Sequence, residues 1–435
     1  MPNAHSIAAN PHHPGESSVR SYSRTFPVVF DRARGPYLEC ISGETYIDFF
    51  CGAGSLNYGH NATELKEAVA RYLAEDRILH GMDMMTAAKF EFLEVFASQI
   101  LAPRNMDYRL QFCGPTGTNA VEAALKLARK IKKRRHVIAF SNAFHGVSMG
   151  SLAVTASAKK RSGSHLPLRD TYFFPYEGFA GGIDTLDLLE SCIGRAGSGY
   201  ELPAALIIET VQGEGGVNIG SQAFLQGIAA FCRRHDILLI VDDIQMGCGR
   251  TGPFFSFERF GIEPDIICLS KSLSGFGLPF SLVLMKPELD IWQPGEHAGT
   301  FRGNNLAFVA ATQAIRTFWS DGRASRSAAA IETSMRSWGA RLRQAHGEIR
   351  DIRGRGAIWG VELDTPGRAS AITRLCFEHN LLIDTCGPSG SVIKVMPPVV
   401  IEEEIFNHGM QILADCTETV LHAGKTEGPA CISAS

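Results

Sequence analysis

Apolar and polar residues follow different periodicities in successive parts of the chain. Near the N-terminus, short β-branched and aromatic runs stand between Gly-Pro and Ser-Gly turns, which is typical of short strands. The predicted strands are 26–30, 37–40 and 45–49. Apolar residues then recur at three- and four-residue spacing, which predicts amphipathic helices over 63–75 and 86–100.

Short aliphatic runs dominate the middle of the chain, and helical stretches separate them. The predicted buried strands are 110–113, 137–140, 206–210, 237–242 and 266–269, with a helix over about 117–132 after the first of them. Repeated strand–helix units build a mainly parallel sheet that helices cover on both faces. We therefore expect an α/β protein whose large domain has a mainly parallel central sheet.

The last part of the chain mixes a long charged helix with short strands. The pattern predicts a helix over 324–346, strands over 356–363 and 392–396, and a final helix from about residue 402. These elements form a small α+β domain, which the N-terminal strands join. The expected organisation is a disordered tail over 1–18, a first part of the small domain over 19–60, a large domain over 61–315, the rest of the small domain over 316–424 and a second disordered tail over 425–435.

Composition narrows the classes of protein. Of 435 residues, 45% are hydrophobic and 20% charged, and the net charge is -3, which argues against nucleic acid or a membrane surface as the main partner. No apolar run approaches the roughly 18 residues of a membrane span, and the N-terminus lacks the apolar core of a secretory signal. The cysteines show no CxxC or zinc-type spacing, so we expect reduced thiols, no metal site and a cytoplasmic protein.

The residues with candidate chemistry follow the predicted strands. Lys271 comes just after the run 266–269, where the carboxyl ends of strands in α/β sheets place their ligands. A lysine there is a candidate for a Schiff base with a carbonyl cofactor. Taken alone, however, the position is more typical of an exposed lysine at a strand end.

Two other strand ends carry groups suited to a flat, anionic ligand. Gly117 and Thr118 open a predicted helix, so they either bind a phosphate through free N–H groups or form a plain helix cap. Phe144 and His145 follow the next strand, where the phenylalanine either stacks on a ring or belongs to the core.

Carboxylates complete the set. Asp242 ends an aliphatic strand, so it needs a cationic partner, which a protonated ring nitrogen would supply. Glu209 also ends a strand, and Glu214 lies in a Gly-rich loop. Such carboxylates also suit a metal or general acid–base catalysis. Together with a lysine, a phosphate site and an aromatic ring on neighbouring strand ends, they favour pyridoxal phosphate over a metal or a nicotinamide.

These residues stand in motifs that resemble the class III, pyridoxal-phosphate-dependent aminotransferases of fold type I, over nearly the whole chain. The most specific stretches are 207–216, 241–252, 269–272 and 299–304. Within the class, a further set is similar to the diaminobutyrate–2-oxoglutarate transaminases, such as the ectoine-pathway enzyme. That set comprises 19–22, 26–30, 56–61, 114–124, 294–297 and 300–305.

The resemblance implies a role for each residue that surrounds the cofactor ring. Lys271 would hold the cofactor as the internal aldimine and then act as the general base. Asp242 would pair with the ring nitrogen and Gln245 would approach the ring hydroxyl. Phe144 and Ile244 would cover the two faces of the ring.

The resemblance also implies a shared site in a homodimer or a dimer of dimers. Gly117 and Thr118 would bind the cofactor phosphate, and Thr300 would reach it from the partner subunit. Glu209 would be an acid behind Phe144 and His145, which border the cofactor.

Substrate recognition is expected at a different set of residues. Glu214 would hold a cationic group when no acidic substrate is bound, and Lys394 stands where the class usually has a carboxylate-binding arginine. Lysine offers a point charge in place of a bidentate fork. Arg302 is either a second cationic contact or part of a surface salt bridge, and the loop around Ala53 borders the substrate.

The implied reaction has two halves, both with small-molecule substrates. L-Glutamate would give its amino group to the cofactor and leave as 2-oxoglutarate, and L-aspartate 4-semialdehyde would then become L-2,4-diaminobutyrate. One alternative is a class III transaminase or aminomutase acting on another ω-amino or semialdehyde substrate. A non-catalytic protein without cofactor is the other alternative.

Overall fold

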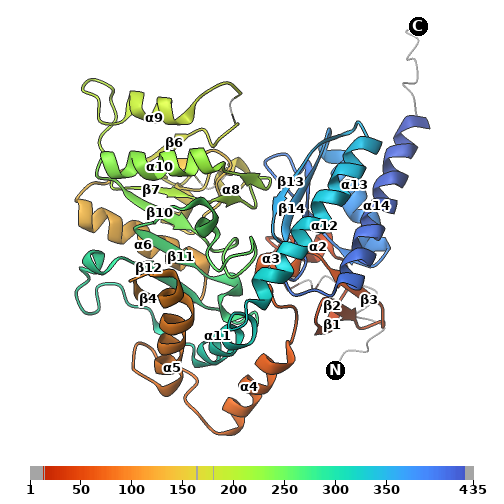
Figure 1. The fold of residues 1–435 in the computed structure, drawn as a ribbon, viewed down its shortest axis with the longest axis horizontal. Coiled ribbons are helices and arrows are strands. Elements are labelled where there is room, and N and C mark those ends of the chain that lie inside the picture. The colour runs from red at the N-terminus through yellow and green to blue at the C-terminus, as the bar shows by residue number, and fades with distance from the viewer. Residues whose placement is uncertain (1–12, 14, 163–164, 180, 427–435) are drawn as a thin grey trace.

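The computed structural model describes residues 13, 15–162, 165–179 and 181–426, and it shows two lobes (Figure 1). Most of the two predicted disordered tails, 1–18 and 425–435, lies outside the described residues. Within the described residues, no helix combines the length and the apolar composition that a membrane crossing requires.

A seven-stranded sheet forms the centre of the larger lobe. Its order is β4-β12-β11-β10-β7-β5-β6, and β12 alone runs antiparallel to its neighbours. The strands are β4 (Arg109–Gly114), β5 (Val137–Phe140), β6 (Thr171–Phe174), β7 (Ala205–Ile208), β10 (Leu238–Asp242), β11 (Ile266–Leu269) and β12 (Ser281–Met285). The predicted α/β class with a mainly parallel sheet is confirmed. The sequence analysis missed β6 and β12, since short runs without clear flanking helices give little periodic signal.

Both faces of this sheet are buried, which explains the continuous aliphatic runs. Successive residues of β10 enter different cores: Leu239 and Val241 pack with α10 (Gln222–Arg234), whereas Leu238 and Ile240 pack with α6 (Gly117–Lys132). The other helices of this lobe are α4 (Thr63–Ala74), α5 (Ala87–Val95), α7 (Met149–Ala153), α8 (Ala158–Arg161), α9 (Thr185–Cys192) and α11 (Asn305–Phe318), and a small ribbon pairs β8 (Val211–Gln212) with β9 (Asn218–Ile219).

The smaller lobe joins the two ends of the chain (Figure 1). One sheet has the order β13-β14-β17-β16, formed by β13 (Ile349–Arg355), β14 (Ile358–Leu363), β16 (Asp384–Cys386) and β17 (Val392–Val395). A second sheet combines β1 (Phe30–Arg34), β2 (Tyr37–Cys40) and β3 (Thr45–Asp48) with β15 (Leu381–Leu382), which runs parallel to β3. The helices are α2 (Tyr22–Thr25), α3 (Cys51–Gly54), α12 (Arg323–Ala345), α13 (Pro366–Glu378) and α14 (Glu403–Thr426).

Two predicted elements have different bounds in the structure. The strand predicted over 26–30 begins only at Phe30, because Pro27 has no N–H to give to a sheet and Val28 N–H bonds within a turn to Phe26 O. The helix predicted over 86–100 is regular only to Val95 and continues as a π-helical turn. Both differences concern backbone hydrogen bonds that side-chain periodicity does not encode.

Arg250 connects the two lobes through hydrogen bonds. Its side chain is fully buried, and its guanidinium donates to Asn57 Oδ1 at 2.6 Å, to Ala357 O at 2.9 Å and to Pro397 O. These acceptors come from three distant parts of the chain. A buried arginine with several hydrogen bonds therefore holds the loop around residues 51–57 at the boundary between the lobes.

Candidate active site

Lys271 lies directly after β11 and opens a single 3₁₀ turn, Lys271–Ser274. Its backbone has φ of 49°, a left-handed conformation that is uncommon for a non-glycine residue. Its Nζ donates to Ala53 O at 2.9 Å. Burial and the charge of Lys394 lower the pKa of Lys271 to about 8, although Glu214 acts in the opposite direction.

Asp242 ends β10 in the neighbouring strand, and its side chain is 5% exposed. Oδ2 lies 2.7 Å from Nδ1 of His145, and Oδ1 accepts the N–H of Ile244 at 3.2 Å. Burial lowers the pKa of His145, but hydrogen bonding and charge from Asp242, together with Glu209, reverse this, so the net shift of its pKa is upward. Because a carboxylate oxygen accepts, Nδ1–H of the imidazole donates to Asp242, while within the described residues its buried Nε2 has no hydrogen-bond partner.

Glu209 lies behind this pair, just after β7. Its carboxylate accepts the N–H of Phe144 at 3.1 Å, and it is buried. Burial raises the pKa of Glu209 to about 8, partly offset by His145. The acid is therefore protonated in a substantial fraction of molecules at neutral pH, which limits the negative charge beside Asp242.

The start of α6 lies beside these groups. The first N–H groups of a helix have no partner within it, and its dipole favours an anion. A Cβ at Gly117 would lie 2.9 Å from Ile244 Cδ1, so only glycine leaves this approach open. The hydroxyl of Thr118 is bonded to Ser148 Oγ at 2.6 Å and to Ser151 Oγ at 2.5 Å.

The sequence analysis missed Glu122 of α6 and two serines at the start of α7, Ser148 and Ser151. Glu122 Oε1 accepts from Ser148 Oγ at 2.7 Å and from the N–H of Ser151 at 3.0 Å. The carboxylate therefore holds both serines against Thr118. No local signal marks this contact, because Glu122 is one of several polar residues on α6 and the serines are about thirty residues away.

Glu214 and Lys394 form an ion pair across from Lys271, in which the side chain of Glu214 is 31% exposed. Lys394 Nζ lies 2.6 Å from Glu214 Oε1, and its side chain is 3% exposed. Burial favours the neutral acid, but Lys394 and Lys271 overcome this and lower the pKa of Glu214 to about 2. Despite burial, Glu214 raises the pKa of Lys394. Both groups are thus charged at neutral pH.

Gln245 and Ala53 connect this pair to Lys271. Gln245 Nε2 donates to Glu214 Oε1 at 3.1 Å and to Ala53 O at 2.9 Å. The Ala53 carbonyl therefore accepts from both Gln245 and Lys271, and it does so with Ala53 at φ of 56°. Sequence reasoning pointed to the loop around Ala53 but could not identify a backbone oxygen as the contact.

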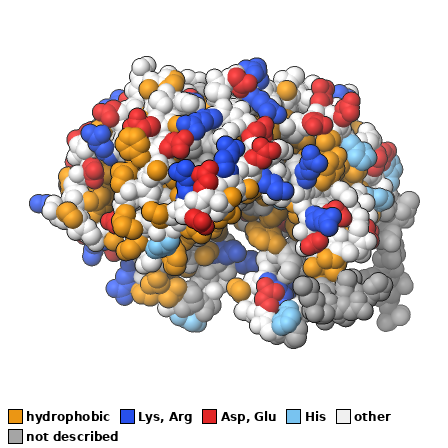
Figure 2. Space-filling model, turned by 90° about the horizontal axis from the view of Figure 1, so that it is seen from below, with side chains coloured by type: hydrophobic (Ala, Val, Ile, Leu, Met, Phe, Trp, Pro, Cys, Tyr) orange, Lys and Arg blue, Asp and Glu red, His pale blue; other side chains and the backbone are white. Residues whose placement is uncertain are grey.

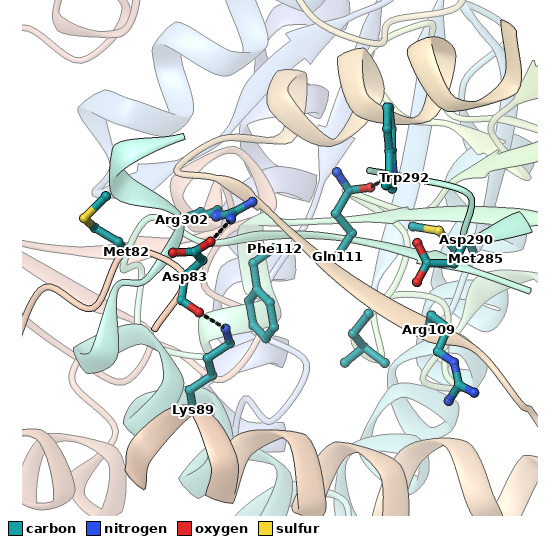
Figure 3. Close-up of a pocket in the computed structure, with 11 residues that line it drawn as sticks. Met82, Asp83, Lys89, Arg109, Gln111, Phe112, Met285, Asp290, Trp292 and Arg302 are labelled. Atoms are coloured by element: carbon teal, nitrogen blue, oxygen red, sulfur yellow. Dashed lines mark hydrogen bonds and ion pairs between the residues drawn. The ribbon is translucent and has the colours of Figure 1, made fainter. Parts of the chain in front are cut away.

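Arg302 and Thr300 lie outside this group within a single chain. Arg302 is paired with Asp83 at 2.5 Å, and both line a separate pocket of about 220 Å³ beside β4 (Figure 3). Figure 3 also shows Lys89 directed at Asp83, whose backbone oxygen it binds at 3.0 Å. Thr300 is exposed on the same short segment.

The strand-end residues can together hold and process an amino compound. Lys271 supplies an amine that is about half neutral near pH 8, Asp242 supplies a carboxylate supported by His145, and the start of α6 suits a phosphate. Lys394 adds a cation near Lys271. Within the described residues, no group of three His, Cys, Asp or Glu side chains is placed to bind a metal ion.

Comparison with known proteins gives the same class. Residues 18–417 match the family described as Aminotransferase class-III. Relatives named diaminobutyrate–2-oxoglutarate transaminase include those of Bordetella parapertussis, 53% identical over 92% of both chains, and Virgibacillus pantothenticus, 50% identical over 93% of this chain and 98% of the relative. The ornithine aminotransferase of Toxoplasma gondii has a TM-score of 0.82 at 26% identity, over 97% of both chains. This chain belongs to the class III aminotransferases.

Members of this class use pyridoxal phosphate, so the predicted enzyme class, fold type and cofactor are confirmed. A transaminase from a marine Virgibacillus, with a TM-score of 0.84 at 20% identity, has the same fold. The residues of this structure fit the cofactor. Lys271 has an amine with a lowered pKa, Asp242 is held by His145, and α6 begins with a glycine whose missing side chain leaves room beside Ile244.

The lowered pKa of Lys271 leads to a pH-dependent prediction. In the cofactor-free protein, the rate at which an amine-selective reagent modifies Lys271 is expected to rise with pH, with a midpoint at about 8, because only the neutral amine reacts. An ordinary lysine has its midpoint at 10.5. Peptide mass spectrometry measures the modification site by site. A midpoint at the ordinary value would contradict the electrostatics described above. In Glu214→Gln the midpoint should fall further, because the carboxylate that raises this pKa is gone.

Proposed function

We propose that this enzyme transfers the amino group of L-glutamate to L-aspartate 4-semialdehyde, giving L-2,4-diaminobutyrate and 2-oxoglutarate. The relatives that are about half identical over nine-tenths of the chain carry the name of this reaction. The observation that carries the proposal is the ion pair Glu214–Lys394 beside Lys271. It supplies a cation for the carboxylate that all four compounds have.

Lys271 and Asp242 are the catalytic residues of the proposal. When bound, pyridoxal phosphate supplies an aldehyde that takes up the amino group and a ring that withdraws electrons from the reacting carbon. Lys271 binds the cofactor covalently and afterwards, as a neutral amine, moves the proton at the reacting carbon. Asp242, paired with His145, holds a proton on the ring nitrogen.

Other residues orient the cofactor in this proposal. Gly117 and Thr118 bind its phosphate at the start of α6, and Gln245 approaches the ring hydroxyl. Phe144 and Ile244 cover the faces of the ring. Ile244 lies beside Gly117, and the backbone of Phe144 is fixed by its hydrogen bond to Glu209, next to His145.

Substrate carboxylates bind at Lys394 in this scheme. Glu214 occupies Lys394 until an anion arrives and then turns away, since one lysine cannot hold two carboxylates in the same geometry. The Ala53 carbonyl accepts from both Lys271 and Gln245 and keeps these two side chains in place while the substrate carboxylate replaces Glu214 at Lys394. Arg302 remains a candidate for a second cationic contact through the partner subunit, because it shares a segment with Thr300.

We further propose a homodimer, or a dimer of dimers, in which Thr300 reaches the phosphate of the partner subunit. Exposed apolar side chains surround the segment that carries Thr300: Phe301 is 67% exposed, Met85 63% and Met84 57%. The ring centroids of His80 and Phe301 are 5.4 Å apart. This contact brings the segment of Met84 and Met85 next to the segment of Thr300. Figure 2, viewed from below Figure 1, shows hydrophobic side chains exposed between charged ones on that face of the molecule. Apolar patches of this kind are typical of subunit interfaces.

A cytoplasmic location is part of the proposal. The ten cysteines of the described residues are unpaired thiols, nine of them buried, as is typical of proteins in a reducing compartment.

The direct test is glutamate-dependent amination of aspartate 4-semialdehyde by the purified enzyme, with 2-oxoglutarate and diaminobutyrate both quantified. Equal amounts of the two products support the proposal. An enzyme that aminates the semialdehyde without releasing 2-oxoglutarate is an aminomutase. Turnover with glutamate but only with other ω-oxo acceptors assigns a different transaminase substrate.

Replacing Lys394 with alanine is expected to raise the KM for glutamate and for 2-oxoglutarate about 100-fold, with a smaller fall in kcat. The change removes the cation for the substrate carboxylate and leaves Glu214 free to repel it. Steady-state kinetics with each substrate varied in turn measures this. Lys394→Arg should recover most of the affinity, whereas the exposed control Lys66→Ala should leave KM unchanged. An unaltered KM in Lys394→Ala would exclude the carboxylate-binding role.

A further inference from the structure

The Gly-rich loop that carries Glu214 joins β8 to β9 in the larger lobe, but it is bonded to the smaller lobe. The backbone oxygen of Glu214 accepts the N–H of Gly387, just after β16, at 2.9 Å. The side chain of Val217 packs in one apolar cluster with Val392 of β17. The loop 213–217 is therefore held against the four-stranded sheet of the smaller lobe.

Arg353 of β13 binds the end of the same loop. Its Nη2 donates to Gly216 O at 2.7 Å, and its Nε donates to Val217 O at 3.1 Å. The same guanidinium pairs with Asp351 at 3.2 Å and with Glu362 at 2.5 Å, both from its own sheet. These carboxylates orient the planar guanidinium, whose fork of N–H donors fits two neighbouring carbonyls.

The conformation that Arg353 holds is an unfavourable one. Val217 has φ of 54°, a left-handed backbone that a β-branched residue rarely adopts, and its side chain is fully buried. A Cβ at Gly360 of β14 would lie 3.0 Å from Val217 Cβ, so the sheet has room for Val217 only because a glycine faces it. Backbone conformations of this kind persist only where surrounding contacts hold them.

The position of the loop matters because Glu214 is part-exposed. Its Oε1 binds Lys394 at 2.6 Å and Gln245 at 3.1 Å, and its side chain is 31% exposed, so water competes for the carboxylate. The strength of such a pair depends on how well the backbone holds the carboxylate in place. In the proposed function, on which this inference rests, the carboxylate of glutamate competes with Glu214 for Lys394.

We propose that Arg353 is a positioning residue that fixes the loop 213–217, keeps Glu214 on Lys394 and thereby sets how strongly Glu214 competes with glutamate. Arg353 acts through the carbonyls of Gly216 and Val217 and does not itself bind the substrate. A loosened loop weakens the competitor, so glutamate should bind more tightly. General damage to the site would have the opposite effect.

The test is Arg353→Met, which keeps an apolar side chain of similar length and removes the donors. The glutamate half-reaction of the holoenzyme is followed in single turnovers over a range of glutamate concentrations, which yields the apparent Kd and the limiting rate. The Kd is expected to fall about 3- to 10-fold, the effect of losing about one hydrogen bond, while the limiting rate changes less than about twofold. Arg353→Lys, with a point charge in place of the fork, should give an intermediate Kd.

The matched control is Arg343→Met. Arg343 lies on α12 and pairs with the same Asp351 at 3.4 Å. Its removal should leave both the Kd and the limiting rate unaltered. A thermal melt of each variant verifies folding, and if Arg353→Met does not fold, Arg353→Lys takes its place with changes of the same sign.

A second background shows whether Arg353 acts through Glu214. In Glu214→Gln the Kd for glutamate should already be low, and adding Arg353→Met should leave it unaltered, because the group that Arg353 positions has lost its charge. An equal fall in both backgrounds overturns the inference. A Kd that rises or stays the same in Arg353→Met alone does so as well.

The pH midpoint of Lys271 modification gives a readout that needs no substrate. Because Glu214 raises the pKa of Lys271, Arg353→Met should lower this midpoint towards that of Glu214→Gln. If glutamate is not a donor, this midpoint decides the inference: a fall supports the hold on Glu214, and an unchanged midpoint overturns it. If glutamate reacts but aspartate 4-semialdehyde is not aminated, the proposed substrate is wrong and the inference stands.

Discussion

Lys271→Ala is expected to reduce transamination by at least about 10⁴-fold and to abolish the visible absorption of covalently bound pyridoxal phosphate. In the proposed mechanism, this one substitution removes both the amine that attaches the cofactor and the base that moves the proton at the reacting carbon. The neighbouring amine of Lys394 cannot replace it. Lys394 Nζ is held by Glu214 at 2.6 Å, and its raised pKa keeps it protonated, which makes it a poor base.

The matched control is Lys286→Ala. Lys286 follows β12, the antiparallel strand, so it lies at the opposite edge of the sheet, where it pairs with Asp265 at 3.1 Å. It should retain both activity and absorption. Retention of the absorption in Lys271→Ala would show that another lysine carries the cofactor, whereas colourless wild-type protein supplied with pyridoxal phosphate would favour a non-catalytic role.

The sequence predicts the convergence at the strand ends better than it predicts the strands themselves. Lys271 and Asp242 follow aliphatic runs, and parallel strands bring their carboxyl ends to one edge regardless of small errors in the boundaries. The strand at 26–30 was wrong by several residues because Pro27 and a local turn decide its start. Topology is therefore robust to mistakes that affect single elements.

Contacts between distant segments could not be predicted in this way. The Ala53 carbonyl reaches Lys271 only because the loop 51–54 adopts left-handed backbone conformations and is held against Arg250. Asp384 lies opposite Lys394 because of the register between β16 and β17. Neither a backbone oxygen nor a strand register leaves a pattern in the residues nearby. The substrate end of the site depends on such contacts, whereas the cofactor end depends on strand ends.

Asp242→Asn is expected to lower the rate of both half-reactions by about 10³-fold while cofactor binding persists. In the proposed mechanism, the Asp242 carboxylate would hold the proton of the cofactor's ring nitrogen, and an uncharged Asn would leave the reacting carbon less activated. An amide of nearly the same shape can still accept the N–H of Ile244. It can also donate to Nδ1 of His145 when the imidazole is neutral and Nδ1 carries no hydrogen. The fold should therefore survive, so the loss can be assigned to charge.

Asp236→Asn provides the control, since Asp236 lies just before the same strand at its other end, is 67% exposed and pairs with Lys132 and Arg134. The measurements are single-turnover rates and the pH dependence of the bound cofactor's absorption. In Asp242→Asn the ring nitrogen should lose its proton at a lower pH than in the wild type, because the anion that favours the protonated ring is absent.

Asp242→Glu, which restores the charge at a slightly different distance, should recover part of the rate. If Asp242→Asn keeps its rate within tenfold and its pH profile unchanged, the positive charge on the ring is maintained by another group. The obvious candidate would then be Glu209, whose pKa of about 8 would have to fall for it to serve as the anion.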